Sequence, residues 1–260
     1  MGIKVTVCEL HNEPAAFASD WKQLVSHVNG EASHLVVLPE MPFYPWFATT
    51  SRFDLPTWQA AVTSHDRWEE RLQELSAALV LSSRPIDRGK LRLNEGFLWE
   101  SQQGYRPIHQ KYYLPNEEAY WEASWYQRGN GDFVPVTQGE LQLGMLICSD
   151  LWSLEHARSY GHAGVHLIAV PRATEQATAD KWIVGGRAAA ILSGAFCLSS
   201  NRAHGAGEPG DFGGRGWVIG PEGDILGLTS QQHPFVTIEI DLQKAELAKK
   251  TYPRYMFAEQ

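Results

Sequence analysis

Three segments of this chain that have the pattern of strands lead directly to a residue that can take part in covalent chemistry. Residues 34–39 lead to Glu40, residues 105–110 to Lys111, and residues 141–147 to Cys148. Short runs rich in apolar side chains and bounded by turn residues are typical of buried strands. Ligands and reactive groups gather at the carboxyl ends of strands in α/β proteins. We therefore expect Glu40, Lys111 and Cys148 to meet at one place.

Helical and strand-like segments alternate along the whole chain. The spacing of apolar residues predicts helices over 14–28, 55–79, 154–160, 179–193 and 242–250, and strands over 3–10, 34–39, 78–84, 91–100, 105–111, 133–136, 141–147, 165–170, 195–200, 217–219 and 235–240. Asn29-Gly30 should end the first helix, and Pro85 the third strand. Residues 41–54, rich in aromatics and proline, predict a loop. With no internal repeat or linker, this order predicts an α/β fold with mixed sheets in a single domain, residues 1–260.

The charge and cysteine content limit the partners and the compartment. A formal net charge of -8, with no basic tail or cluster, makes nucleic acid and anionic membranes improbable partners. No apolar run has the length that spans a bilayer, and the N-terminus lacks the features of a signal peptide. Three cysteines, Cys8, Cys148 and Cys197, are too few and of odd number for a disulfide framework. We therefore expect a cytoplasmic protein in which Cys8 and Cys197 are buried and inert.

A cysteine nucleophile needs a base to move protons, a cation that favours the thiolate, and donors aimed at the developing oxyanion. Glu40 would be the base for Cys148. Lys111 would lower the thiol pKa and stabilise the oxyanion, together with the backbone N–H of Ser149. Each residue alone also has an ordinary structural interpretation, since a single cysteine after an apolar run more often serves packing than catalysis.

The segments around these residues match a known set of motifs in order and spacing. They are Pro39-Glu40, residues 109–115 around Lys111, residues 144–150 around Cys148, residues 155–158 before 164–171, Ser200-Asn201-Arg202, and residues 217–224. Over nearly the whole chain they resemble the motifs of the carbon–nitrogen hydrolase (nitrilase) superfamily. The resemblance implies a four-layer α-β-β-α sandwich of two mixed β-sheets flanked by helices. It also implies a homodimer or higher oligomer formed through the layer that holds the helix after the cysteine.

The same resemblance implies a second glutamate between the lysine and the cysteine. In the family this residue shortly precedes an aromatic pair and a glycine, and residues 122–129 fit that register. Glu122, rather than Glu117 or Glu118, is therefore expected to orient Lys111 and the substrate. Arg128 stands where the family usually has a proline before the glycine, so the course of this loop departs from the family pattern.

The implied activity is hydrolysis of the amide of a small molecule through a thioester on Cys148, with no cofactor. Family nitrilases usually follow the cysteine with Trp-Glu-Asn, whereas Ser-Asp-Leu-Trp follows it here, which favours an amidase or a carbamoylase. D-amino-acid carbamoylases place an arginine shortly after the cysteine, where this chain has Leu151 and Trp152. An N-carbamoyl hydrolase or a nitrilase remains the alternative chemistry, and the residues do not distinguish a hydrolase from an acyl transferase.

The candidate substrate-binding residues beyond Ser149 are Trp152, Arg172, Tyr44 and Trp46. Tyr44 and Trp46, in the aromatic loop, and Trp152 would form an apolar acyl pocket, although the loop could equally cover the core. Arg172 could hold an anionic group or serve as structural support.

Two other classes of protein compete with this interpretation. The chain has ten histidines but no His-Glu-x-x-His and no paired Cys-x-x-Cys, so we expect no metal site. A non-catalytic binding protein on the same fold is less consistent with an intact set of four reactive residues. Residues 213–216, in a glycine-rich loop over 205–216, lack the flanking pattern of a phosphate loop and are expected to form a tight turn near the site.

Overall fold

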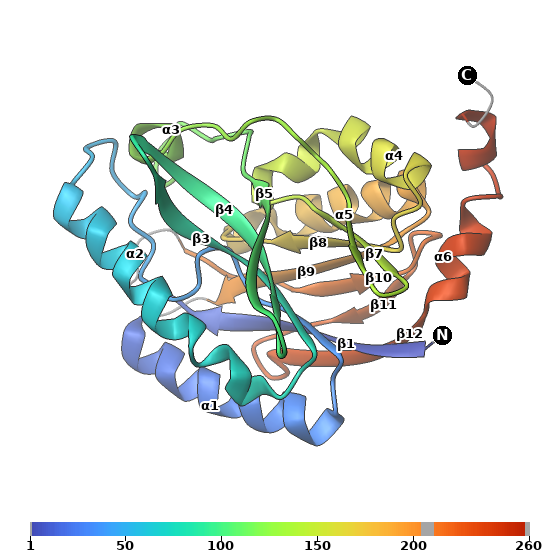
Figure 1. Cartoon of the computed structure of the whole chain (residues 1–260), viewed down its shortest axis with the longest axis horizontal. Coiled ribbons are helices and arrows are strands. Elements are labelled where there is room, and N and C mark those ends of the chain that lie inside the picture. Colours follow the sequence, from blue (N-terminus) through green and yellow to red (C-terminus); the bar gives the residue numbers. More distant parts are fainter. Residues whose placement is uncertain (1, 204–210, 258–260) are drawn as a thin grey trace.

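The computed structural model describes residues 2–203 and 211–257 (Figure 1). The strands are β1 (Gly2–His11), β2 (Leu35–Val37), β3 (Leu79–Arg88), β4 (Leu91–Glu100), β5 (Gly104–Gln110), β6 (Val136–Gln138), β7 (Leu141–Met145), β8 (Leu167–Pro171), β9 (Phe196–Ala203), β10 (Trp217–Ile219), β11 (Ile225–Leu228) and β12 (Phe235–Asp241). The α-helices are α1 (Pro14–Glu31), α2 (Leu55–Glu69), α3 (Glu122–Trp125), α4 (Leu154–His162), α5 (Ala179–Ser193) and α6 (Leu242–Ala248). Short 3-10 turns are η1 (Leu72–Leu75), η2 (Cys148–Trp152), η3 (Gln176–Thr178) and η4 (Arg254–Phe257). Residues 205–210 of the predicted glycine-rich loop lie outside the described residues.

All these strands are linked by hydrogen bonds into one twelve-stranded sheet, in the order β5-β4-β3-β2-β1-β9-β8-β7-β6, with β12 beside β1 and β10 beside β9. The central strands are parallel and the outer ones antiparallel, which confirms the predicted mixed α/β class. The two sheets of the expected sandwich are joined through β1. Its first part pairs with β2 and β12, and its last three residues pair with β9.

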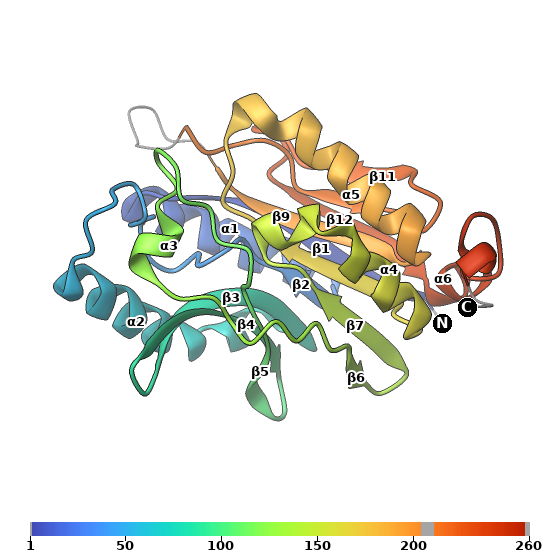
Figure 2. The same ribbon diagram turned by 90° about the horizontal axis from the view of Figure 1, so that it is seen from above.

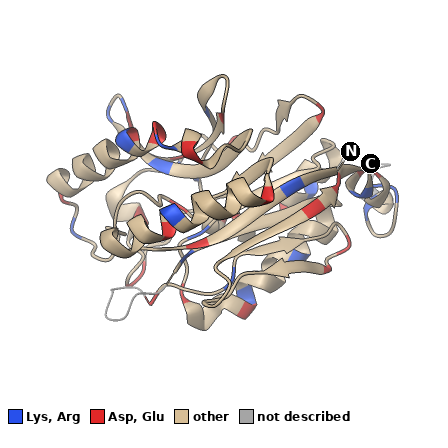
Figure 3. Cartoon of the chain, turned by 90° about the horizontal axis from the view of Figure 1, so that it is seen from below, with Lys and Arg blue, Asp and Glu red and all other residues tan. Residues whose placement is uncertain are grey.

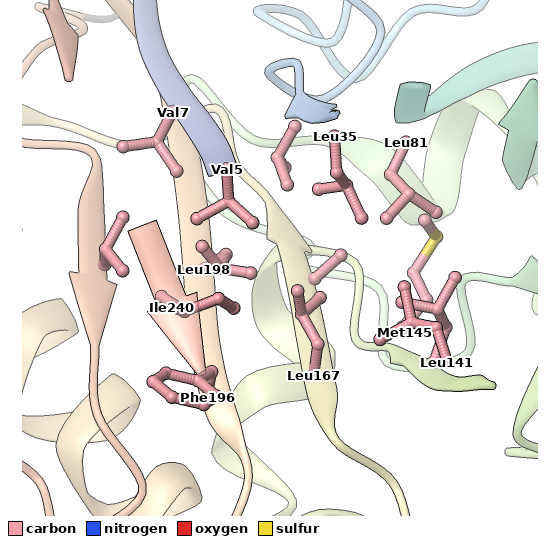
Figure 4. Close-up of a cluster of buried hydrophobic side chains, with 14 of the residues drawn as sticks. Val5, Val7, Leu35, Leu81, Leu141, Met145, Leu167, Phe196, Leu198 and Ile240 are labelled. Carbon is pink, nitrogen blue, oxygen red and sulfur yellow. The ribbon is translucent and has the colours of Figure 1, made fainter. Parts of the chain in front are cut away.

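The core lies between the two halves of this sheet. Figure 4 shows Val5, Leu35 and Leu81 from one half facing Leu167 and Leu198 from the other. Because side chains alternate along a strand, the neighbouring residues of each strand face outward onto helices. On one side they pack against α1, and on the other against α4 and α5 (Figure 2). Strands buried on both faces explain why their sequences are almost continuously apolar.

Two element boundaries differ from the sequence prediction. Helix α1 continues through Asn29-Gly30 to Glu31, and Ala32, with a φ of 52°, takes the left-handed position that we expected of a glycine. Strand β3 runs through Pro85 to Arg88. Since β2 accompanies β3 only as far as Leu81, Pro85 has β4 as its ladder partner on one side only, and strand edges accept proline.

Other differences are smaller. The helical pattern over 55–79 divides into α2 and η1, and the short strand β11 carried no clear signal. No helix in the described ranges is both long and apolar enough to cross a bilayer. Acidic and basic residues are interspersed on the face seen in Figure 3.

Candidate active site

Glu40, Lys111, Glu122 and Cys148 come together from four separate segments. Glu40 lies three residues beyond β2, Lys111 directly follows β5, Glu122 begins α3, and Cys148 begins η2. The Lys111 Nζ atom lies 2.7 Å from Oε1 of Glu40 and 2.5 Å from Oε2 of Glu122. Each of the four residues is at most 4% exposed. The fold thus gathers the four residues that the sequence singled out into one buried cluster, which we call the reactive cluster.

The loop after β8 holds Glu40 and Cys148 toward each other. The Glu40 N–H donates to the carbonyl of Arg172 over 3.1 Å, and the N–H of Ala173 donates to the Cys148 thiol. Cys148 itself has a φ of 50°, in the left-handed region that non-glycine residues rarely adopt. Backbone strain of this kind persists where surrounding contacts fix it, and it concentrates at functional sites.

Asp150 joins the segment after Lys111 to the turn that carries Cys148. Its carboxylate is fully buried, and Oδ1 accepts the N–H groups of Tyr112 and Tyr113 over 3.2 and 3.0 Å. Oδ2 accepts the N–H of Ile147 over 3.2 Å and lies 2.9 Å from Nε2 of His109. The sequence matched Asp150 only as part of the cysteine motif, and its bridging contacts appear only in the fold.

The reactive cluster is built so that the thiol is neutral at rest. Burial raises the pKa of the Cys148 thiol well above its ordinary value, Glu40 raises it further, and Lys111 opposes this only in part. Lys111 lowers the thiol pKa, as we expected, but two carboxylates share its charge and its effect is outweighed. Burial alone would lower the pKa of Lys111, yet Glu122 and Glu40 outweigh it and raise that pKa. Burial also raises the pKa of Glu122, to about 7, against the effect of Lys111.

The two carboxylate oxygens of Glu40 have different surroundings. Oε1 accepts hydrogen bonds from Lys111 and Asn94, each over 2.7 Å. Oε2 is buried and has no hydrogen-bond partner within the described residues. An ammonium has three N–H groups, and contacts with Glu40 and Glu122 engage two of those of Lys111, so the third is available to another acceptor.

Cys148 opens onto a cavity of about 560 Å³. Ser149 and Trp152 also line it, and the Trp152 ring centroid lies 5.0 Å from that of Trp182. The remaining lining residues are Pro115, Glu117, Glu118, Tyr120, Glu122, Ala173, Thr174, Glu175, Thr178, Lys181 and Trp182. Four carboxylates and one ammonium therefore face this space, together with three large aromatic rings.

Tyr44, Trp46 and Arg172 lie away from the cavity wall. Trp46 is 5% exposed and packs with Tyr44 in an aromatic cluster around α3, because an apolar loop of this composition is most stable when it covers apolar side chains. The Arg172 guanidinium is fully buried and donates to Ser199, Thr174 and the carbonyl of Arg215, each over 2.7 Å. Three of the five N–H groups of Arg172 are thus used inside the protein, where they hold the loop after β8.

Two further residues support the site without having been assigned a role from sequence. Arg202 donates to the carbonyl of Glu40 over 3.2 Å, and also to the carbonyls of Met41 and Tyr44. Asn201 accepts the N–H of Thr174 over 3.0 Å. Their position in the Ser200-Asn201-Arg202 motif was the available signal, and the fold shows that they hold the loops on either side of the reactive cluster.

The other two cysteines, Cys8 and Cys197, are not among the residues that line the cavity. Cys8 and Cys197 are fully buried free thiols, as predicted, and burial raises the pKa of both, that of Cys197 to about 12. Within the part of the chain that the structure describes, no three His, Cys, Asp or Glu side chains are grouped so that they could hold a metal ion.

Known proteins share this fold over its full extent. The chain is 23% identical over 270 residues to a chloroplastic omega-amidase of Arabidopsis thaliana, a match covering 96% of this chain and 70% of that protein. The structure superposes on a carbon-nitrogen hydrolase from Helicobacter pylori G27 with a TM-score of 0.86 and 21% identity, covering 100% of this chain and 96% of the other. At such identities the structural likeness establishes the fold.

A second structural neighbour is an amidase from Nesterenkonia sp., with a TM-score of 0.74, 19% identity and 95% of each chain covered. A mutant of the Nesterenkonia AN1 amidase carries the acetamide moiety of fluoroacetamide, covalently added at its active-site cysteine. The family model for carbon-nitrogen hydrolases matches residues 4–250. Since this match spans nearly the whole length, the chain belongs to the carbon–nitrogen hydrolase family.

Proposed function

We propose that this protein hydrolyses the amide bond of a small molecule through a thioester on Cys148. The observation that carries the proposal is the position of the Cys148 thiol, between the cavity and the buried cluster of Glu40, Lys111 and Glu122. A thiol that is neutral at rest needs an adjacent base to become a nucleophile. The amidase relatives, and the adduct on the cysteine of one of them, support this assignment.

In the first half of the reaction the amide carbonyl carbon enters the cavity beside Cys148. The thiol proton passes to Oε2 of Glu40 while the sulfur–carbon bond forms. The carbonyl oxygen, now negative, accepts the third N–H of Lys111 and the backbone N–H of Ser149. Preorganised donors of this kind commonly lower such barriers by about 3–4 kcal/mol each. Glu40 then returns the proton to the amide nitrogen, which leaves as ammonia or an amine.

In the second half water hydrolyses the thioester. The water oxygen bonds to the acyl carbon while Glu40 takes a proton from the water. The N–H groups of Lys111 and Ser149 again stabilise the oxyanion. The carbon–sulfur bond breaks, and Glu40 returns the proton to the Cys148 thiolate. Glu122 remains hydrogen-bonded to Lys111 throughout and keeps the ammonium aimed at the cavity.

Intact mass spectrometry tests this proposal directly. Wild type, Glu40→Gln and Cys148→Ala proteins are incubated with primary amides, N-carbamoyl compounds and nitriles, and ammonia is measured in parallel. An acyl adduct on Glu40→Gln that is absent from Cys148→Ala, with ammonia released by the wild type, is the expected result. Adducts from amides alone would identify an amidase, whereas ammonia release by Cys148→Ala would refute the thioester route.

We also propose that the protein is a homodimer that works in a reducing compartment such as the cytoplasm. Val184 on α5 is 63% exposed, which suits a surface covered by a second copy. Three free cysteines suit a reducing environment. Light scattering of wild type and Val184→Glu would give half the wild-type mass for the variant, and equal masses would contradict this interface.

A further inference from the structure

The buried amide of Asn94 touches the proposed base directly. Asn94 lies in β4, is fully buried, and its Nδ2 atom donates to Oε1 of Glu40 over 2.7 Å. Its backbone carbonyl accepts the N–H of Lys111 over 2.9 Å, so one residue fixes both the glutamate side chain and the lysine backbone. The carboxylate must face a donor, which determines that Nδ2 and not Oδ1 points at Glu40.

The second N–H of the same amide extends the contact to Glu122. Asn94 is also hydrogen-bonded to the Tyr126 hydroxyl, which itself donates to Oε2 of Glu122. Lys111 contacts both Glu40 and Glu122. The five side chains therefore form a closed ring, and each is at most 1% exposed.

The ring makes the two oxygens of Glu40 chemically different. Oε1 accepts from Asn94 and Lys111, whereas Oε2 has no partner among the described residues. Two donors on one oxygen hold the carboxylate in a single orientation. A free carboxylate would otherwise rotate and present either oxygen to the thiol.

We propose that Asn94 is the positioning residue of the base, leaving Oε2 of Glu40 as the atom that receives the Cys148 proton. Tyr126 extends this function to Glu122. The inference rests on the proposed thioester chemistry, in which Glu40 acts as the base. Asn94 touches no reacting atom, so its effect is exerted wholly through Glu40.

Acrylamide is a suitable probe because it reports thiol activation without requiring turnover. The Cys148 sulfur bonds to the terminal carbon of acrylamide, and the thiol proton ends on the carbon next to the carbonyl. The rate of addition is measured by intact mass across a pH series. The matched control is Ser82→Ala, since the Ser82 hydroxyl donates over 2.7 Å to the carbonyl of Pro39, beside Glu40 but not to its carboxylate.

Asn94→Leu should slow the addition roughly 10- to 100-fold at neutral pH, as is typical when an outer partner of a reactive group is removed. The acidic limb of its pH–rate profile should move up by about one pH unit, because a charge-assisted donor to the carboxylate is lost. Ser82→Ala should keep the wild-type limb. Equal limbs in Asn94→Leu and wild type would overturn the inference.

Tyr126→Phe keeps the test decisive if Asn94→Leu does not fold. This substitution removes only the hydroxyl, and the acidic limb of the variant's pH–rate profile should shift in the same direction by a smaller amount. A limb at the wild-type position would count against the ring. The Glu40→Gln variant tests the proposed base separately from the ring. Slow addition in Glu40→Gln with wild-type behaviour in the Asn94 and Tyr126 variants would refute the ring alone, whereas fast addition in Glu40→Gln would refute the proposed base itself.

Discussion

Replacing Lys111 with methionine should destabilise the protein strongly at neutral pH and much less in acid. Lys111 is 1% exposed and lies between two carboxylates, 2.7 Å from Glu40 and 2.5 Å from Glu122. Methionine has a similar length but leaves both carboxylates buried without a cation. Removing one partner of a buried ion pair costs about 3–5 kcal/mol, which is the loss of unfolding free energy that we expect at about pH 8.

The pH dependence follows from the carboxyl groups that remain. Burial already raises the pKa of Glu122 to about 7 with the lysine present, and Lys111 is the strongest neighbour opposing that rise. A carboxyl whose pKa is raised on folding contributes stability below its unfolded value, and this stability is lost as the pH rises through the folded value. The variant should therefore recover in acid, with a residual deficit of about 1–2 kcal/mol at about pH 5 from lost hydrogen bonds.

Urea unfolding followed by tryptophan fluorescence measures this at both pH values. The control is Lys181→Met, since Lys181 is an exposed lysine on the cavity wall, and its removal should change stability by less than about 0.5 kcal/mol. The double variant Lys111→Met/Glu122→Gln should regain part of the lost unfolding free energy, because only one carboxylate is then left buried without a cation. A deficit of equal size at both pH values, or one below about 1 kcal/mol at about pH 8, would refute the reasoning.

Three further outcomes are expected. Because burial and Glu40 raise the pKa of the Cys148 thiol, the ultraviolet thiolate absorbance that distinguishes wild type from Cys148→Ser should stay flat between about pH 6 and 9; a thiolate titrating near neutrality would contradict this. Gly129→Ala would place a Cβ 2.4 Å from the Cβ of Gln110, beside Lys111, so thermal unfolding should show a loss of about 1–3 kcal/mol and ammonia release should fall; wild-type stability would count against this packing. Since Glu117, Glu118 and Glu175 line the cavity with one ammonium, that of Lys181, while Glu122 is paired with Lys111, an amide with an ammonium-bearing acyl group should show a higher kcat/KM than its carboxylate analogue. Salt should reduce the difference, and a preference for the carboxylate would contradict it.

Local patterns allowed the reactive residues to be identified before the fold was known. Glu40 and Cys148 each lie three residues beyond a strand, and Lys111 directly follows one. Parallel strands end at a common edge, so a residue's place in the strand pattern predicts its neighbours there. Glu122 was different, since no strand precedes it, and only its register before Trp125 and Tyr126 in a family motif indicated it.

The element boundaries that we predicted wrongly depend on residues that lie far away in the sequence. Pro85 stays within β3 because β2 has already ended beside Leu81. The joining of the two expected sheets through β1 likewise depends on β9, which follows almost two hundred residues later. A short stretch of sequence contains none of these partners, so the spacing of its apolar residues could not have predicted them.

The sequence by itself determined which reactive groups this protein has and that strand ends would bring three of them together. Only the tertiary structure decided how those groups behave. Asn94 and Arg202 contact Glu40 across 54 and 162 residues of chain. The thiol of Cys148 is neutral at rest because it is buried and because two carboxylates share the charge of Lys111. Burial and charge sharing are properties of a packed environment, and that environment exists only after distant segments have met.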